Sequence, residues 1–147
     1  STLSKTCGKK LKIILIGRQR EDAGSDHLYF MCKKNEFLIE RTGELSTEII
    51  SKQLQDCSLS VSTTPFDVIG KSGATAAMLE HGLSVLAYDD GDTPQKSLFI
   101  PHTFKDQIFL INDHSSVEKV LQNIEKPRKS FFDGVAHTAN KMLELVF

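Results

Sequence analysis

The fold of this chain is decided by residues 59–88, which read LSVSTTPFDVIGKSGATAAMLEHGLSVLAY. Leu59–Thr63 and Ser84–Tyr88 have the short, largely apolar pattern of β-strands. Between them, Ser72–His81 has the pattern of a helix, which Gly82 ends. A strand, a helix and a second strand at this spacing indicate two parallel strands joined by a right-handed crossover.

The same alternation of strands and helices continues on both sides of this stretch. The pattern predicts further strands at Lys12–Gly17, Phe37–Arg41 and Gln107–Ile111, and further helices at Ser25–Lys34, Ser46–Cys57, from Ser115 onward, and at Ser130–Val146. Ile13–Ile16 is a continuous apolar run, typical of a strand buried on both faces. Ser115 and Glu118 have the spacing of a helix capping box. We therefore expect an α/β, Rossmann-like three-layer domain with a parallel sheet, formed by residues 1–147 as one domain.

Composition and charge exclude several classes of protein. The 147 residues carry 18 Lys+Arg and 19 Asp+Glu, for a formal net charge of -1, with both signs scattered. This argues against a nucleic-acid partner and a polybasic membrane patch. No apolar run approaches the roughly 18 residues of a transmembrane segment. Cys7, Cys32 and Cys57 form no CxxC pair, so we expect buried, reduced thiols in a cytoplasmic protein. The five histidines have no metal-ligand spacing, and no metal site is expected.

The loops that follow the strands are the expected place for a ligand, because open parallel sheets bind ligands outside the carboxyl ends of their strands. The richest of these loops is Thr63–Ala74, which contains Gly70, Lys71 and Gly73 just before a helix. Unpaired amides, the positive end of a helix dipole and a lysine together predict an anion site, most naturally for phosphate. A turn that merely caps a helix is the alternative, and the residues alone leave both open.

Two enzyme motifs also match part of this loop. Gly70-Lys71-Ser72 is the end of a P-loop pattern, but Pro65 stands where that pattern requires its first glycine. Asp67–Ala74 imitates the strand, Gly-x-Ser-x-small residue and helix of a nucleophile elbow. Asp113 and His137 follow Ser72 in the order of a hydrolase triad. An α/β-hydrolase-like esterase that uses Ser72 is therefore an alternative function.

Several segments together resemble a known family. Lys12–Gly17 is similar to its strand that ends in Gly, and Phe37–Leu45 to the next strand with its Gly-containing turn. Ser46–Cys57 is similar to the helix that follows, and Ala77–Val85 (AMLEHGLSV) to a helix ending in His-Gly-Leu-Pro-Val before a strand. The order of these segments over residues 11–90 resembles the donor-binding domain of GT-B glycosyltransferases, especially the retaining family 4 type.

The resemblance implies a site for a nucleotide diphosphate sugar, UDP- or GDP-linked, from which a hexose is transferred to an acceptor hydroxyl without a metal. Backbone groups of Thr42–Leu45 would contact the base. Gly70–Ala74 would hold the diphosphate on the helix N-terminus, with Lys71 compensating its charge. The donor-binding residues so predicted are Gly17, Arg18, Thr42, Gly43, Leu45, Asp67, Gly70, Lys71, Ser72, Gly73, Ala74 and Glu80. No catalytic residue is assigned.

The chain departs from the family in ways that define a further alternative. The family carries a ribose-binding Glu where Ala77 stands, and Glu80 lies three residues further on. Its Arg and Lys that neutralise the leaving diphosphate lie on an earlier strand–helix unit, and its acceptor domain is a second domain in the same or a partner chain. The start at Ser1 and the apolar end Leu143–Phe147 suggest a piece of a longer protein. A non-catalytic nucleotide-binding or scaffold relative is the alternative to an enzyme.

Overall fold

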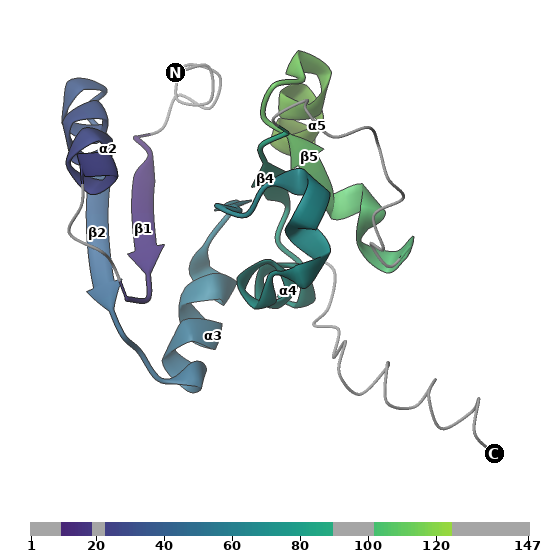
Figure 1. The fold of residues 1–147 in the computed structure, drawn as a ribbon, viewed down its shortest axis with the longest axis horizontal. Helices are drawn as coiled ribbons and strands as arrows, with labels where there is room; N and C mark the ends of the chain where they lie inside the picture. The colour runs from purple at the N-terminus through teal and green to yellow at the C-terminus, as the bar shows by residue number, and fades with distance from the viewer. Residues whose placement is uncertain (1–9, 19–22, 90–101, 125–147) are drawn as a thin grey trace. The chain divides into compact units, whose positions relative to one another are not determined.

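The computed structural model describes residues 10–18, 23–89 and 102–124 (Figure 1). The helix expected at Ser130–Val146 lies outside these residues. The chain divides into two compact units, Ser1–Lys52 (unit 1) and Gln53–Phe147 (unit 2), and we describe each by itself. The expectation of one domain over residues 1–147 stays a prediction.

Unit 1 contains a strand–helix–strand motif. β1 (Lys12–Ile16), α2 (Ala23–Lys34) and β2 (Leu38–Gly43) follow one another, and the two strands pair in parallel. These elements confirm the predicted strands and helix, with small differences at their ends. The Lys12 ammonium forms an ion pair with the Glu40 carboxylate at 2.6 Å, so this side chain of β1 reaches a side chain of β2.

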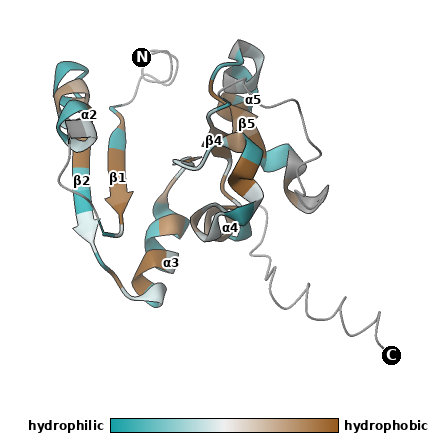
Figure 2. Cartoon of the chain, viewed as in Figure 1, coloured by the Kyte–Doolittle hydropathy of each residue, from teal (hydrophilic) through white to brown (hydrophobic). Residues whose placement is uncertain are grey.

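Unit 1 has a very small core. Among its described residues, only Cys32 of α2 is a buried side chain, at 2% exposed. The prediction that Ile13–Ile16 is buried on both faces is wrong, because all four side chains are only half-buried. β1 is strongly hydrophobic (Figure 2), but within the described residues it pairs with β2 alone. A two-stranded parallel sheet offers too few neighbours to cover such a strand.

Helix α3 (Thr47–Asp56) carries the boundary between the two units and confirms the helix predicted at Ser46–Cys57. A hydrogen bond from the Ser46 side chain is the main cause that lowers the pKa of Glu48 in its first turn. Near its other end Leu54 is buried. Cys32 and Cys57 are free thiols, the first buried and the second half-buried, while Cys7 lies outside the described residues.

Unit 2 contains a three-stranded parallel sheet. Its strands are β3 (Ser60–Val61), β4 (Val85–Ala87) and β5 (Ile108–Leu110), in the order β3-β4-β5. The segments between and after the strands are η1 (Phe66–Lys71), α4 (Gly73–Glu80), η2 (His102–Gln107) and α5 (His114–Ile124), where η marks a 3-10 helix. In register, Val85 lies opposite Ile108 and Leu86 opposite Phe109.

The core of unit 2 lies on both faces of this sheet. One cluster joins Leu79, Val85 and Phe104, with Met78 and Ile108 packed against it. The other joins Leu86, Phe109 and Val120, with Leu59 and Ile124 packed against it. Because neighbouring residues of a strand point to opposite faces, α4 covers one face and α5 the other. The sequence-based expectation of an α/β protein in which parallel strands alternate with helices is therefore confirmed.

The end of α4 and the start of α5 show which residues stop and start these helices. α4 ends in a turn in which the amides of Gly82 and Leu83 donate to the carbonyls of Leu79 and Met78, at 2.9 and 3.1 Å. Gly82 has φ 72, a left-handed conformation that glycine adopts without strain, so the predicted helix stop is confirmed.

The predicted capping box at the start of α5 is wrong, because Asp113 caps this helix. Its carboxylate accepts hydrogen bonds from the Ser115 amide at 3.0 Å and from the Ser115 and Ser116 hydroxyls at 2.8 and 2.7 Å. The bond from Ser116 is the largest of the causes that lower the pKa of Asp113. A carboxylate is a stronger acceptor than a hydroxyl, and the helix dipole favours it at this end.

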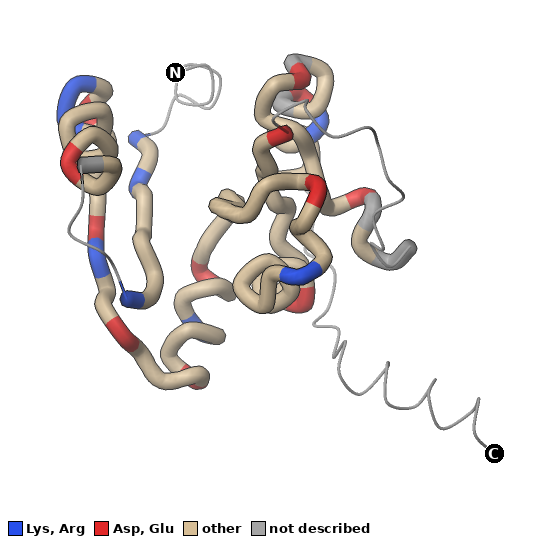
Figure 3. Tube along the Cα trace, viewed as in Figure 1, with Lys and Arg blue, Asp and Glu red and all other residues tan. Residues whose placement is uncertain are grey.

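Basic and acidic residues are interspersed along the described segments, as Figure 3 shows. Within those segments, no helix is long and apolar enough to cross a membrane.

Candidate functional site

The segment between β3 and α4 is neither the tight turn directly after a strand that a nucleophile elbow requires nor the open glycine loop of a P-loop. Residues Phe66–Lys71 form the 3-10 helix η1, so Gly70 and Lys71 belong to a helical turn rather than to an open loop. Ser72 then adopts an extended conformation, with φ -89 and ψ 108, and α4 begins at Gly73. The predicted start of the helix is confirmed to within one residue.

The N-terminus of α4 leaves two backbone donors open. The Ser72 hydroxyl accepts from the Thr75 amide at 3.2 Å, and the Ser72 carbonyl accepts from the Ala76 amide at 2.9 Å. Among the residues that the structure describes, the amides of Gly73 and Ala74 have no recorded partner. A Cβ added at Gly73 would meet nothing within 4 Å, so there is open space on the side-chain side of Gly73. This is the arrangement that a helix offers to an anion.

A buried pair of hydroxyls joins this helix to the end of β3. The Ser62 and Thr75 hydroxyl oxygens lie 2.9 Å apart, and these residues are 6% and 2% exposed. The Ser62 oxygen also accepts from the Thr64 amide at 3.1 Å. Because buried polar groups need partners, these bonds fix the first turn of α4 relative to the strand.

The carboxyl ends of the three strands of unit 2 meet beside this loop. The Phe66 amide donates to the Tyr88 carbonyl at 2.9 Å, which ties η1 to the end of β4. The Asn112 side chain donates to the Asp89 carbonyl at 2.6 Å, which ties the end of β5 to the same place. The sequence analysis did not identify Ser62, Thr75 or Asn112. The positions of Ser62 after a predicted strand and of Thr75 in the first turn of a predicted helix could have indicated these two hydroxyls.

The predicted site residues of unit 2 fall into two groups. Asp67, Gly70, Lys71, Ser72, Gly73 and Ala74 lie together in η1 and the first turn of α4. Lys71 is exposed and forms no ion pair with another described residue. Glu80 is the last residue of α4, about 10 Å along the helix axis from Gly73, so it lies at the opposite end from the open amides.

The predicted site residues of unit 1 also lie together, at the ends of β1 and β2. The Gly17 amide donates to the Gly43 carbonyl at 3.1 Å, and both glycines have positive φ, at 104 and 67. The Thr42 hydroxyl donates to the Leu15 carbonyl at 3.3 Å and accepts from the Gly17 amide at 3.4 Å. These bonds hold the residues at the end of β1 against those at the end of β2.

Arg18 and Leu45 complete this group in unit 1. The Arg18 Nε donates to the Glu44 carboxylate at 2.7 Å, so its charge is already paired, and both side chains are well exposed. Leu45 is half-buried. That Arg18 reaches a phosphate and that Thr42–Leu45 contact a base stay predictions.

The geometry opposes the esterase alternative. The nucleophile of that family sits on a strained turn directly after a strand, whereas Ser72 is extended, follows a 3-10 helix and has its hydroxyl engaged as a helix cap. Asp113 caps α5 through Ser115 and Ser116. His137 lies outside the described residues.

Comparison with known proteins adds no relative. No family model, no curated protein and no solved structure matches this chain. Within the part of the chain that the structure describes, no group of three or more His, Cys, Asp or Glu side chains could hold a metal ion.

Proposed function

We propose that this chain contributes the donor-binding part of a GT-B glycosyltransferase, and that the loop from Gly70 to Ala74 holds the diphosphate of a nucleotide sugar. The observation that carries the proposal is the pair of amides at Gly73 and Ala74, which pair with no described residue and follow Lys71 in the chain. The family resemblance and the anion-site argument lead independently to this loop.

The architecture supports the finer fold prediction of a Rossmann-like domain. In each unit, strands that are consecutive in the chain are neighbours and parallel. In unit 2, helices cover both faces of the sheet. A doubly wound sheet is built from halves of this kind. The acceptor domain, in the same or a partner chain, and a cytoplasmic location belong to the same proposal.

The chemistry of this domain would be electrostatic. As the glycosidic bond of the donor breaks, negative charge accumulates on the leaving diphosphate. Amides fixed at a helix N-terminus stabilise that charge without reorganising, and the Lys71 ammonium adds a mobile cation. The hydroxyl pair Ser62–Thr75 holds the first turn of α4 in place. These groups do not require a metal.

Ala77 favours a second candidate, a non-catalytic nucleotide-binding relative. At this position the side chain is a methyl group, and the Ala77 carbonyl accepts from the His81 ring at 2.7 Å. A methyl group cannot hydrogen-bond a ribose, so the site would hold a nucleotide by its phosphates alone. Such a protein would bind UDP, GDP and ADP with similar affinity.

The test is a titration of the ¹⁵N-labelled chain with UDP, GDP and ADP, following the amides of residues 70–77. We expect selective shifts at Gly73 and Ala74, and Lys71→Ala should weaken binding by about three- to tenfold because an exposed cation is lost. Lys119→Ala, which removes the same charge from α5 on the other face of the sheet, is the matched control. Absence of shifts at millimolar nucleotide would contradict the proposal.

A further inference from the structure

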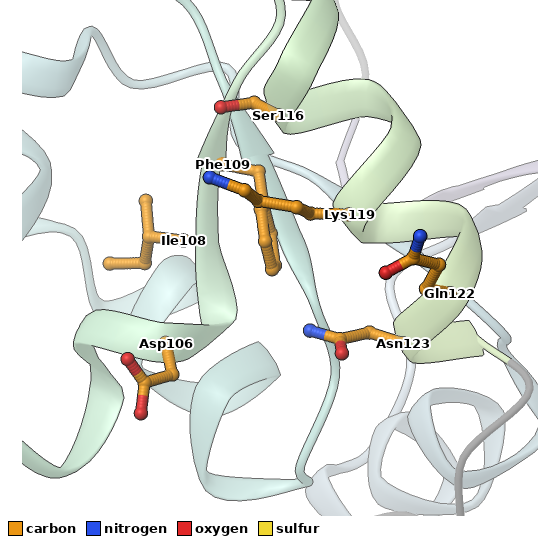
Figure 4. A pocket seen from close by; sticks show the side chains of 7 residues that line it. All are labelled: Asp106, Ile108, Phe109, Ser116, Lys119, Gln122 and Asn123. Carbon is orange, nitrogen blue, oxygen red and sulfur yellow. The ribbon is translucent and has the colours of Figure 1, made fainter.

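Unit 2 also has an open hollow that shares no residue with the loop between β3 and α4. An open pocket of about 360 Å³ is lined by Asp106 of η2, Ile108 and Phe109 of β5, and four polar side chains of α5, namely Ser116, Lys119, Gln122 and Asn123 (Figure 4). Its volume falls at the lower end of the range for ligand pockets. The pocket involves none of the residues of the proposed donor site.

The pocket reaches around the free edge of the sheet. Ile108 and Phe109 are neighbours in β5 and leave the strand on opposite sides (Figure 4). Ile108 packs with the α4 cluster and Phe109 with the α5 cluster. Within the described residues β5 pairs with β4 alone. A cavity that touches both side chains therefore includes the strand edge that faces away from β4.

The backbone of β5 presents hydrogen-bonding groups at this edge. The Ile111 amide donates to the Ala87 carbonyl of β4 at 2.9 Å. Because alternate residues of a strand face the same neighbour, Phe109 also faces β4, while Ile108 and Leu110 turn their amides away from it. The Leu110 carbonyl accepts from the Asp113 amide at 3.3 Å. Because η2 runs to Gln107 and a 3-10 turn bonds residues i and i+3, the Ile108 amide closes the last turn of η2. Toward the described residues, the edge is left with the amide of Leu110 and the carbonyl of Ile108.

The charges around the pocket are of both signs. Asp106 and Lys119 are exposed, and neither forms an ion pair with another described residue. A ligand that complements both would carry a cation near Asp106 and an anion near Lys119. Its main chain would have to match the strand edge, and an extended polypeptide supplies alternating donors and acceptors at that spacing.

We propose that the edge of β5 binds an extended peptide segment as an additional strand, with an acidic side chain of the peptide beside Lys119 and a basic one beside Asp106. Main-chain hydrogen bonds to the Ile108 carbonyl and the Leu110 amide provide affinity. The two charges and the amide side chain of Gln122 select among segments. This interaction does not depend on the proposed transferase function.

The experiment uses the 147-residue chain and a six-residue blocked peptide of alternating Val and Thr that carries one Lys and one Glu. We expect the peptide to shift the amide of Leu110 in the NMR spectrum. The same peptide with N-methylated alternate residues keeps every side chain and both charges but lacks the donors, and should bind about tenfold more weakly. Lys119→Glu should weaken binding of the original peptide by about two- to fivefold.

Four results would overturn the proposal. The first is that the original peptide causes no shifts in β5. The second is that the N-methylated peptide binds as tightly as the original peptide, which would indicate contact through charge alone. The third is a dependence of the β5 shifts on protein concentration without peptide, which would make a second copy the occupant. The fourth is that glucose shifts the side-chain amides of Gln122 and Asn123 while the peptide does not, which would make the ligand a sugar.

Discussion

Units 1 and 2 both place apolar strands in parallel pairs, but only unit 2 buries them. Val85, Leu86 and Ala87 of β4 are 0%, 5% and 0% exposed. Ile13–Ile16 of β1 is at least as apolar, yet none of its residues is buried. In unit 1, large apolar side chains such as Phe30 and Leu38 are 62% and 59% exposed.

The cause of this difference is the number of neighbours. β4 has a strand on each side and a helix layer on each face. β1, among the described strands, has β2 on one side only. Hydrophobic stabilisation is proportional to the area removed from water, so equal sequences contribute unequally in the two places. An apolar run therefore shows how much side-chain area a strand could bury. The number of neighbouring strands and helices determines how much of that area is buried.

The largest expected effect comes from truncating matched leucines in the two sheets. Leu86→Ala removes a buried side chain from β4 and should cost about 2–5 kcal/mol of unfolding free energy. Leu15→Ala changes the corresponding type of residue in half-buried β1 and should cost about 1 kcal/mol, because less area is lost. Urea denaturation of both variants measures the two values. Equal costs would show that β1 is covered and would break the comparison.

A smaller loss of stability is expected from removing the threonine hydroxyls that form hydrogen bonds near the strand ends. Thr75→Val removes the buried bond to Ser62 and should cost about 1–3 kcal/mol, whereas Thr75→Ser should keep most of the stability. The counterpart in unit 1 is Thr42→Val, which removes half-buried bonds to Leu15 and Gly17 and should cost less than about 1 kcal/mol. Thermal unfolding of the three variants decides. A larger loss for Thr42 than for Thr75 would reverse the proposed ranking of the two units.

The smallest effect is that of acid on the helix starts. Hydrogen bonds lower the folded-state pKa of Asp113 and Glu48, so each contributes stability that is fully present above its unfolded pKa, near 4. That stability is lost as the pH falls through the folded value. We expect the Ser115 amide signal to shift along with the Asp113 titration, and Asp113→Asn to remove this step. A Ser115 shift that persists in Asp113→Asn would refute the cap.

The fold was largely readable from local patterns. The strand at Ser84–Tyr88, the helix at Ser72–His81 and its stop at Gly82 all follow from periodicity and from glycine's tolerance of positive φ. The start of α5 was misread because Asp113 and Ser115 are both good caps, and their competition is decided by the electrostatics of the folded turn. The 3-10 helix at Phe66–Lys71 was predicted as part of a loop, since its single short turn leaves no periodic apolar pattern in the sequence.

The candidate sites divide in the same way. Gly70–Ala74 could be found from sequence, because open amides at a helix start are a local property. The bond between Ser62 and Thr75 and the pocket at the edge of β5 could not, because each joins residues that are far apart in the chain.

The sequence by itself determined the order of strands and helices in this protein, and it points to the loop that we propose as an anion site, since both inferences depend on short-range backbone preferences. Only the tertiary structure decided which apolar strand is buried, which cap starts α5 and which strand edge stays open. Those properties depend on the number and distance of neighbours, which a linear pattern does not contain.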